Sequence, residues 1–328
     1  MKNKSKTFII AEIGNNHEGN FKIAKKLVYQ AAKCNVDAVK FQTFKTDQFI
    51  NIKNKKRFKQ LKKFELSQNE FYKLYKITKQ LKLKFISTPF DFQSVEFLGK
   101  FVDYFKVSSG DNNFYQLIEK ILKFKKPTII STGFLNFNEI KKLIRFIKYR
   151  KFPLKKLTFL HCVSDYPVKD FEANLNSIPY LKKKLKIKIG YSDHTIGIVA
   201  PVIASTIGAD VIEKHFTLNK NYSNFRDHNL SADPNEMSQM VQLIRRAKLM
   251  MGKNMKIISK SEKKNLLSTR RSIYASRNIK KFENFNMRNL KVVRSGEGLE
   301  PNKIFSILKK KAKIKINKNH LIKNSEIF

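Results

Sequence analysis

The sequence is poor in acidic residues, in arginine and in cysteine, and it contains no long apolar run. No stretch of about 20 apolar residues is present, which excludes a transmembrane helix. Two cysteines, Cys34 and Cys162, cannot build a disulfide framework, so we expect a reducing, cytoplasmic location. The basic amino terminus is followed by only a short apolar run and then by Glu12. This pattern predicts a first buried strand and argues against a signal peptide.

The scarcity of acidic residues gives the chain an extreme charge. It has 26 acidic and 68 basic residues, a net charge of +42. Nucleic-acid binding is one interpretation of this charge, and it is the non-enzymatic alternative. However, only 11 of the basic residues are arginine, the type best suited to reading phosphates and bases, and the lysines are scattered along the chain. We therefore favour a compositional bias without a specific nucleic-acid partner, although the field can still steer anionic substrates.

The 328 residues fit one barrel of about 250 residues followed by a module of about 60. Short apolar, β-branched runs alternate with segments of helical periodicity, which predicts parallel βαβ units. The runs cover residues 8–13, 38–42, 84–88, 104–108, 128–132, 157–162, 187–192 and 211–216. Eight such units predict a closed (β/α)8 TIM barrel in the α/β class.

The rest of the chain divides at a change of pattern. We expect the barrel domain to span residues 1–252 and a Lys-rich linker to span residues 253–269. Residues 270–328 are expected to form a small β-rich domain with strands in RRSIYAS, NLKVVRSG and KAKIKINK. Within the barrel, the connection between residues 43 and 83 is longer than a minimal unit needs, which predicts an excursion over the barrel mouth.

Polar residues follow the apolar runs, where barrel enzymes carry their working groups. Lys40 and Lys106 end two of these strands, and Glu12 and Glu213 lie on two others. Two ammonium groups together with nearby hydroxyls suit a phosphorylated or carboxylated anion. The alternative is that a lysine merely pairs with Glu12 or Glu213, although two buried like charges need a partner.

Two histidines end consecutive strands. His194 and His215 are 21 residues apart, and adjacent barrel strands bring such positions close together. Two imidazoles completed by water and substrate oxygens suit an octahedral ion such as Mn²⁺ better than structural zinc. The alternative is two separately hydrogen-bonded histidines.

Eight strings of residues, taken in order, resemble the sialic acid synthase family, which includes legionaminate and pseudaminate synthases. They are AEIGNNHEG (11–19), DAVKFQTF (37–44), ISTPFD (86–91), FKVSSGD (105–111), IISTGF (129–134), LHCVSDYP (160–167), IGYSDHTIGI (189–198) and VIEKHFTL (211–218). The tail resembles that family's antifreeze-like (SAF, β-clip) domain. The resemblance covers nearly the whole chain.

The resemblance implies roles for matching positions. It makes His194 and His215 the metal ligands, with Mn²⁺ expected and Mg²⁺ or Co²⁺ possible, and Glu12 the catalytic carboxylate beside Lys40, Lys106 and Glu213. The implied phosphoenolpyruvate-binding residues are Lys40, Thr88, Lys106, Ser109, Ser131 and Ser192. The implied amino-sugar-binding residues are Gln42, Tyr166 and Asp227. Arg294 matches an arginine that the small domain places near the N-acyl group in the other subunit, which implies a domain-swapped homodimer.

The implied activity is that of an N-acetylneuraminate synthase-type transferase. It joins phosphoenolpyruvate to N-acetylmannosamine or to 2,4-diacetamido-2,4,6-trideoxymannose. Another phosphoenolpyruvate-condensing barrel or a metal-dependent aldolase is the alternative enzyme. The chain departs from the family at Glu18, where Asn is usual, and at Phe134, where Met is usual.

Overall fold

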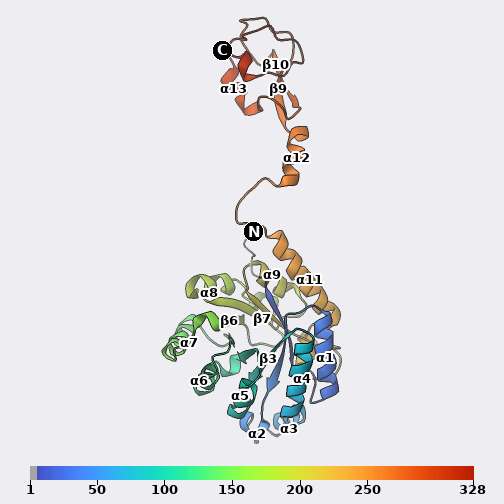
Figure 1. Ribbon diagram of the computed structural model, residues 1–328, viewed down its shortest axis with the longest axis vertical. Helices are drawn as coiled ribbons and strands as arrows, with labels where there is room; N and C mark the ends of the chain where they lie inside the picture. The colour runs from blue at the N-terminus through green and yellow to red at the C-terminus, as the bar shows by residue number, and fades with distance from the viewer. Residues whose placement is uncertain (1–5) are drawn as a thin grey trace. The chain divides into compact units, whose positions relative to one another are not determined.

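The computed structural model describes residues 6–328 of a chain that forms two compact units, Met1–Gly252 and Lys253–Phe328. The first unit is a closed barrel in which each strand pairs in parallel with the next and β8 pairs with β1 (Figure 1). Its strands are β1 Phe8–Gly14, β2 Ala38–Thr43, β3 Lys84–Pro89, β4 Tyr104–Val107, β5 Thr128–Ser131, β6 Leu157–Cys162, β7 Lys188–Asp193 and β8 Val211–His215. All eight predicted strands are confirmed within one residue at each end.

Helices cover the outside of the barrel. They are α1 Phe21–Lys33, α4 Gln68–Gln80, α5 Phe92–Gly99, α6 Tyr115–Lys123, α7 Phe137–Tyr149, α8 Ser177–Leu185, α9 Val199–Thr206 and α11 Pro234–Met250. Their apolar faces pack on the outward side chains of the strands in one continuous core. The last of them, α11, begins as its sequence predicts: Asp233 caps it, Pro234 occupies the first turn and Glu236 completes a capping box.

Side chains that point into the barrel form an apolar layer with a polar layer on top. The apolar layer consists of Ile10, Ala38, Ile86, Ile129, Leu160 and Val211. Because strand side chains alternate, the residue two positions further along each strand also points inward. These residues are Glu12, Lys40, Thr88, Ser131, Cys162 and Glu213, and all of them line one hollow. The strand period therefore places the predicted chemistry at the carboxyl end of the barrel.

A buried ion pair lies on the outer side of β7 and β8. The Nζ atom of Lys214 lies 2.7 Å from Oδ2 of Asp193, and neither side chain is exposed. The other oxygen of Asp193 accepts hydrogen bonds from the Tyr191 hydroxyl and from Thr195. Asp193 and Lys214 immediately precede His194 and His215, so this network fixes the backbone that carries both histidines.

Removing one partner of this pair is expected to destabilise the barrel. Lys214→Ala leaves the buried carboxylate of Asp193 without its cation, so the free energy of unfolding should fall by about 3–5 kcal/mol. Lys182→Ala removes a more exposed pair, Lys182–Asp210, and should cost at most about 1 kcal/mol. Denaturant unfolding of both variants checks this. Equal losses of unfolding free energy in the two variants would contradict the larger contribution assigned to the buried pair.

The predicted excursion between β2 and β3 is present. It contains α2 Thr46–Phe49 and α3 Lys55–Phe64, which lie at one end of the barrel (Figure 1). An aromatic cluster holds it there: Phe64 meets Phe225 edge-on with ring centroids 5.2 Å apart. Phe225 precedes the short helix α10, Arg226–Leu230, so the excursion packs against the segment that follows β8.

The second unit has its own core, with an antiparallel pair formed by β9 Arg271–Ala275 and β10 Leu290–Arg294. The predicted third strand, KAKIKINK, is wrong as a continuous strand, because its residues form only isolated bridges. Ala312 pairs with Ile327 and Ile316 pairs with Ile279, whereas Ile314 between them is exposed. The chain bends there and changes partner, so the alternating pattern does not extend one ladder.

The predicted linker, residues 253–269, contains regular structure. Residues Lys260–Thr269 form α12, which begins with a capping box between Ser259 and Glu262. A short α13, Ile304–Ile307, belongs to the core of the second unit.

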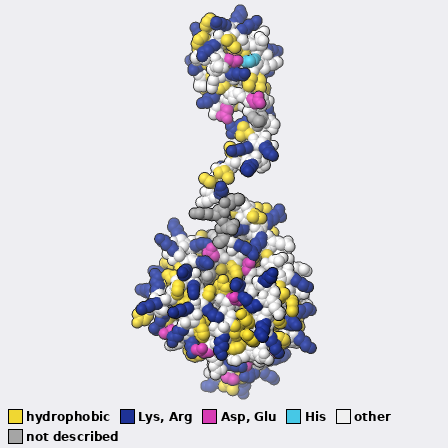
Figure 2. All heavy atoms as spheres, in the orientation of Figure 1, with side chains coloured by type: hydrophobic (Ala, Val, Ile, Leu, Met, Phe, Trp, Pro, Cys, Tyr) yellow, Lys and Arg dark blue, Asp and Glu magenta, His cyan; other side chains and the backbone are white. Residues whose placement is uncertain are grey.

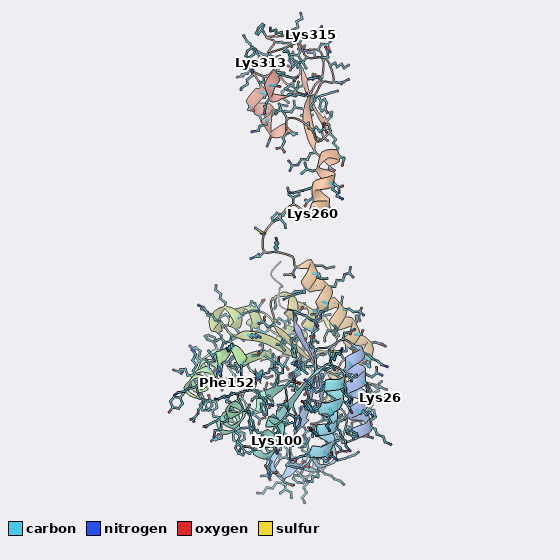
Figure 3. All side chains as sticks on the ribbon, in the orientation of Figure 1. Lys26, Lys100, Phe152, Lys260, Lys313 and Lys315 are labelled. Atoms are coloured by element: carbon cyan, nitrogen blue, oxygen red, sulfur yellow. The ribbon has the colours of Figure 1, made fainter. Side chains whose placement is uncertain are left out.

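Lysine and arginine side chains are spread over the visible surface of both units (Figure 2). The lysines labelled in Figure 3 lie on separate parts of the chain: Lys26 on α1, Lys100 after α5, Lys260 on α12, and Lys313 with Lys315 in the second unit. This scatter agrees with a compositional origin of the charge. Within residues 6–328, no helix combines the length and the apolar character that a membrane crossing needs.

Candidate active site

The hollow at the carboxyl end of the barrel brings together most of the predicted site. Twelve of the predicted residues line it: Glu12, Lys40, Gln42, Thr88, Lys106, Ser109, Ser131, Tyr166, Ser192, His194, Glu213 and His215. Nine of them lie on strands, and Ser109, Tyr166 and His194 lie in the loops that follow β4, β6 and β7, so all eight strands contribute. Asp227 lines a wider adjoining hollow. Arg294 lies on β10 in the second unit, exposed to solvent and opposite Arg271, and it is not a lining residue of either hollow.

Four buried charged groups form the centre of the inner hollow. The Nζ atom of Lys40 lies 2.9 Å from Oε1 of Glu213 and 3.4 Å from Oε2 of Glu12. The Nζ atom of Lys106 lies 3.5 Å from the same oxygen of Glu213. Each of these side chains is at most 5% exposed. Both expectations for the lysines therefore apply: they converge on one pocket, and in the free protein they pair with the carboxylates.

The two carboxyl groups differ in their pKa values. Burial raises the pKa of Glu12 to about 7, helped by the charge of Glu213 and opposed by Lys40, Lys106 and Gln42. Burial acts in the same direction on Glu213, but Lys106, Lys40 and a hydrogen bond from Ser192 outweigh it and hold its pKa well below the usual range. Glu213 is thus a permanent anion, whereas Glu12 can exchange a proton near neutral pH, as an acid–base group must.

The charge of Lys106 is sensitive to pH. Burial, with the neighbouring Lys40 charge, lowers the pKa of Lys106 to about 8 against the attraction of Glu213. Its ammonium form therefore predominates below about pH 8 and is lost above it.

Affinity for an anionic substrate should consequently fall as the pH rises through about 8. We expect kcat/KM for phosphoenolpyruvate, which reports the free enzyme, to decline about tenfold per pH unit above that value. Lys106→Gln should lower kcat/KM by about 10- to 100-fold and remove this limb of the profile. A limb that survives in that variant would assign the ionisation to another group.

Hydroxyl groups surround the charged centre and provide donors for an anion. Ser192 Oγ donates to Glu213 at 2.9 Å. The Oγ atom of Ser131 is buried and has no hydrogen-bond partner among the described residues. Thr88 and Ser109 also line the hollow. An unsatisfied buried hydroxyl costs free energy, so Ser131 is placed for a ligand oxygen.

The two predicted histidines face the same hollow. The ring centroids of His194 and His215 are 5.5 Å apart. Nδ1 of His194 lies 2.8 Å from the carbonyl oxygen of Val163, which can only accept, so Nδ1 carries a proton, and in the neutral imidazole Nε2 has the lone pair. Nδ1 of His215 is buried without a partner among the described residues. Burial first, then the charges of His194 and Lys40, lower the pKa of His215 well below its usual value.

These imidazoles fit two positions of a divalent cation. A metal-ligating histidine is commonly fixed through its second nitrogen by a backbone carbonyl, as His194 is by Val163. A neutral His215 has a lone pair to donate. No group of three or more His, Cys, Asp and Glu side chains suited to a metal ion occurs in the described part of the chain. A cation here would therefore take its remaining ligands from water and substrate oxygens.

The adjoining hollow has a volume of about 310 Å³ and shares Gln42, Ser109, Tyr166 and His215 with the inner one. Tyr166 stacks on His194 with ring centroids 4.1 Å apart. Burial raises the pKa of the Tyr166 hydroxyl, which therefore stays protonated and can donate. Asp227, 6% exposed, has its Oδ1 atom buried in the same hollow. Phenol, amide and carboxylate groups of this kind suit the hydroxyl and amide groups of a sugar.

Asn15 belongs to this hollow although it was not among the predicted site residues. Its Nδ2 atom donates to Oε1 of Gln42 at 2.7 Å, which turns the other end of the Gln42 amide toward Glu12 at 3.4 Å. The Oδ1 atom of Asn15 is buried and has no partner among the described residues. Its place one residue after the turn at Gly14 was visible in the sequence, but its contact with Gln42 depends on the packing of β1 against β2.

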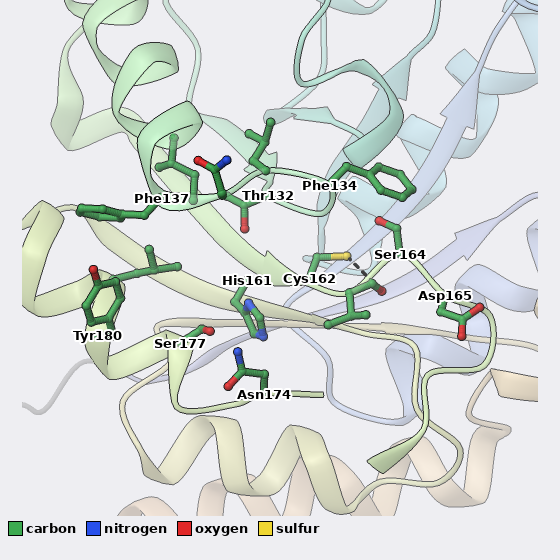
Figure 4. A pocket seen from close by; sticks show the side chains of 15 residues that line it. Thr132, Phe134, Phe137, His161, Cys162, Ser164, Asp165, Asn174, Ser177 and Tyr180 are labelled. Carbon is green, nitrogen blue, oxygen red and sulfur yellow. Dashed lines mark hydrogen bonds between the residues drawn. The ribbon is translucent and has the colours of Figure 1, made fainter. Parts of the chain in front are cut away.

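A larger cavity of about 500 Å³ lies beside the site, between the segments that follow β5 and β6 (Figure 4). His161, Asn174 and Tyr180 line this cavity. Phe134 and Ser164 line both this cavity and the adjoining hollow, and they lie between the two. None of the predicted site residues lines this cavity. Size alone therefore does not mark the chemical centre, which is the smaller and more polar hollow.

Comparisons with known proteins point in one direction. The model of the NeuB family matches residues 27–256. The chain is 45% identical to an uncharacterised protein of Methanocaldococcus jannaschii over 94% of this chain and 90% of that protein. It is 38% identical to the N,N'-diacetyllegionaminic acid synthase of Campylobacter jejuni over 97% of this chain and 99% of the relative. The crystal structure of N-acetylneuraminic acid (sialic acid) synthetase from Leptospira borgpetersenii, in complex with citrate, superposes with a TM-score of 0.75 at 32% identity, covering 79% of this chain and 90% of that one.

Proposed function

The chain belongs to the NeuB family, and from this membership we propose that it condenses phosphoenolpyruvate with an open-chain N-acyl amino sugar. The products are a sialic-type nonulosonic acid and inorganic phosphate. The observation that carries the proposal is the buried group of Lys40, Lys106, Glu12 and Glu213, beside two histidines and next to a sugar-sized hollow. The names of the relatives support two acceptors, N-acetylmannosamine and 2,4-diacetamido-2,4,6-trideoxymannose.

Lys40 and Lys106 would hold the phosphate and carboxylate of phosphoenolpyruvate. In the free protein they pair with Glu213 and Glu12, so binding exchanges one set of anionic partners for another without leaving an ammonium group unpaired. Ser131, whose hydroxyl has no described partner, and Ser192 would donate to the same anion. Two substrates held in register account for a large part of the rate enhancement.

His194 and His215 would hold a divalent cation, with Mn²⁺ the first choice. Such a cation supplies Lewis-acid polarisation of the acceptor's aldehyde oxygen. Gln42, Tyr166 and Asp227 would orient the sugar chain in the adjoining hollow.

The carbon–carbon bond forms when the methylene carbon of phosphoenolpyruvate attacks the aldehyde carbon, whose oxygen takes up a proton. Positive charge develops on the carbon that bears the phosphate ester. Water adds there, and Glu12 in its carboxylate form accepts the proton that the water loses. The tetrahedral intermediate then releases phosphate by cleavage of its carbon–oxygen bond, leaving a ketone. With its pKa near 7, Glu12 suits this proton transfer.

We also propose, from the resemblance of the tail, that the second unit is an antifreeze-like domain and that the protein is a domain-swapped homodimer. In that assembly Arg294 would approach the N-acyl group of the acceptor bound by the partner subunit. Molar mass measured in solution tests the dimer, and Arg294→Ala tests the contact through KM for the acceptor.

The function is tested with purified protein, phosphoenolpyruvate, Mn²⁺ and a panel of acylated amino sugars. We expect phosphate release only when both substrates are present, with a product mass equal to their condensation. If phosphoenolpyruvate instead released phosphate with a non-acylated aldose and not with any acylated amino sugar, the protein would be another phosphoenolpyruvate-condensing barrel. Salt-sensitive binding to nucleic acid without any turnover would favour the non-enzymatic alternative.

A further inference from the structure

Glu18, one of the positions at which this chain departs from its family, connects two loops at the barrel mouth. Its Oε1 atom accepts a hydrogen bond from the hydroxyl of Ser223 and lies 3.2 Å from Nε2 of His228. A carboxylate oxygen can only accept, so Nε2 of His228 carries a proton at this contact. The two partners lie 205 and 210 residues further along the chain, in the loop and short helix that follow β8.

This contact is largely shielded from water. The His228 side chain is 1% exposed and the Glu18 side chain is 16% exposed. The other ring nitrogen of His228, Nδ1, lies 2.7 Å from Oγ1 of Thr217, and the Tyr222 ring lies against the imidazole with centroids 5.3 Å apart. Hydrogen bonds to a carboxylate are stronger than bonds between neutral groups, and they are screened less when they are shielded. The contact of Glu18 therefore stabilises the position of the loop that it reaches.

The loop that Glu18 reaches carries a residue of the proposed acceptor site. Asp227 precedes His228 on α10 and lines the hollow that adjoins the charged centre, here called the acceptor hollow. Glu18 itself lines neither this hollow nor the inner one. An effect of Glu18 on the acceptor therefore has to act through the segment that contains Asp227.

The loop after β1 holds this segment, residues 223–231, at both of its ends. At the end nearer α11, the amide of Asn16 donates to the hydroxyl oxygen of Ser231 at 3.0 Å, and that hydroxyl donates to the carbonyl oxygen of Asp227 at 2.5 Å. At the other end, Glu18 accepts from Ser223 and contacts His228. Asp227 lies between these two attachments, and loss of the contacts of Glu18 would leave one of them.

The backbone at Glu18 indicates that its side chain is there for this contact. Its φ is 46°, in the left-handed region, which asparagine adopts more readily than glutamate. Asparagine, the usual family residue here, would suit the backbone better, but it is one methylene shorter. Glutamate accepts the less favourable conformation and gains the length that reaches Ser223 and His228.

We propose that Glu18 is a positioning residue, which holds Asp227 in the acceptor hollow by binding Ser223 and His228. When a site is complete in only a fraction of the molecules, its apparent affinity falls by that fraction. The contacts of Glu18 keep this fraction high before the acceptor binds. The inference rests on the proposed function and adds to it a residue that sets the affinity for the acceptor.

The kinetic test uses the full-length protein with Mn²⁺ and saturating phosphoenolpyruvate. The acceptor is N-acetylmannosamine or 2,4-diacetamido-2,4,6-trideoxymannose, whichever the wild type converts. Glu18→Ala should raise KM for the acceptor about tenfold, because it removes the hydrogen bonds to a carboxylate that hold the segment. The kcat should stay within about twofold of the wild type, since a saturating acceptor selects the complete site. The dissociation constant of phosphoenolpyruvate should not change.

Two further variants at the same position separate positioning from general damage. Glu18→Gln keeps the length and an acceptor oxygen, so it should restore most of the affinity for the acceptor. Glu18→Asn is one methylene too short and should behave like Glu18→Ala. The matched control is Glu96→Ala, which breaks an ion pair with Lys120 on the outer helix α5, away from the lining residues of both hollows. An unchanged acceptor KM in Glu18→Ala, an equal loss in Glu18→Gln, or an equal rise in the dissociation constant of phosphoenolpyruvate would overturn the inference.

Amide hydrogen exchange of the free protein separates failure of this inference from failure of the proposed function. The amides of His228 and Ser231 donate to the carbonyl oxygens of Phe225 and His228, at 3.1 and 3.2 Å. They should exchange about tenfold faster in Glu18→Ala and at the wild-type rate in Glu96→Ala. Unchanged exchange in Glu18→Ala would overturn the inference.

Equilibrium binding of the same two sugars completes the separation. Faster exchange together with weaker sugar binding in Glu18→Ala, in a protein whose wild type converts no acceptor, would reject the proposed function and keep the role of Glu18. Conversion of an acceptor by the wild type, with a KM that Glu18→Ala leaves unchanged, would reject the role of Glu18 alone.

Discussion

Glu12→Gln is expected to lower kcat by a factor of about 10²–10⁴ while leaving the affinity for phosphoenolpyruvate unchanged or slightly higher. Glutamine keeps the shape of the side chain and its contact with Gln42, but it cannot accept a proton. Because Glu12 is one of two carboxylates beside Lys40 and Lys106, its neutral replacement removes a competitor for the bound anion. The loss should therefore appear in turnover rather than in binding.

Steady-state kinetics together with equilibrium binding of phosphoenolpyruvate separate these two effects. Glu119→Gln is the control, since Glu119, on the outer helix α6, forms a partly exposed ion pair with Arg150 at the end of α7. That variant should behave like the wild type. A Glu12→Gln enzyme with full turnover, or one whose defect lies wholly in phosphoenolpyruvate affinity, would remove Glu12 from the proton transfer.

Loss of both imidazoles is the second large effect. The His194→Ala/His215→Ala variant is expected to bind Mn²⁺ at least about 100-fold more weakly than the wild type and to lose metal-dependent turnover. The rings lie 5.5 Å apart, and no third group suited to a metal ion accompanies them among the described residues. Few protein ligands would remain after the substitution.

The readout for this variant is the metal itself, measured by electron paramagnetic resonance of free Mn²⁺ during titration. His320→Ala is the matched control, because His320 pairs with Glu326 in the second unit and lines neither hollow. Wild-type Mn²⁺ affinity in the double variant would refute the assignment even if turnover were lost, since a collapsed pocket alone could abolish activity.

The barrel was predictable because its strands share one pattern: an inward-pointing apolar residue is followed two positions later by an inward-pointing polar residue. Ile10 precedes Glu12 by two positions, as Ala38 precedes Lys40 and Val211 precedes Glu213. Alternation places the first member of each pair in the apolar layer and the second at the mouth. The clustering of the nine predicted residues that lie on strands follows from this period once the strands close into a barrel, and the loops add Ser109, Tyr166 and His194.

Other parts of the site depend on contacts that no local pattern encodes. The Asn15–Gln42 hydrogen bond forms across two strands, and its direction follows from the position of Glu12. Arg57 reaches the acceptor hollow because Phe64 packs on Phe225, more than 150 residues away in the sequence. The alternating tail failed as a predictor for the opposite reason: a bend at Ile314 divides one apparent strand between two partners.

The most direct measurement of the central claim uses phosphoenolpyruvate labelled with ¹³C at its methylene carbon and with ¹⁸O at the bridging ester oxygen. Condensation at the Lys40–Lys106–Glu12–Glu213 centre predicts a product in which the ¹³C methylene is bonded to the former aldehyde carbon. It also predicts that the released phosphate retains the ¹⁸O label. Recovery of the ¹³C label in free pyruvate, or release of phosphate without the ¹⁸O label, would contradict condensation at this centre.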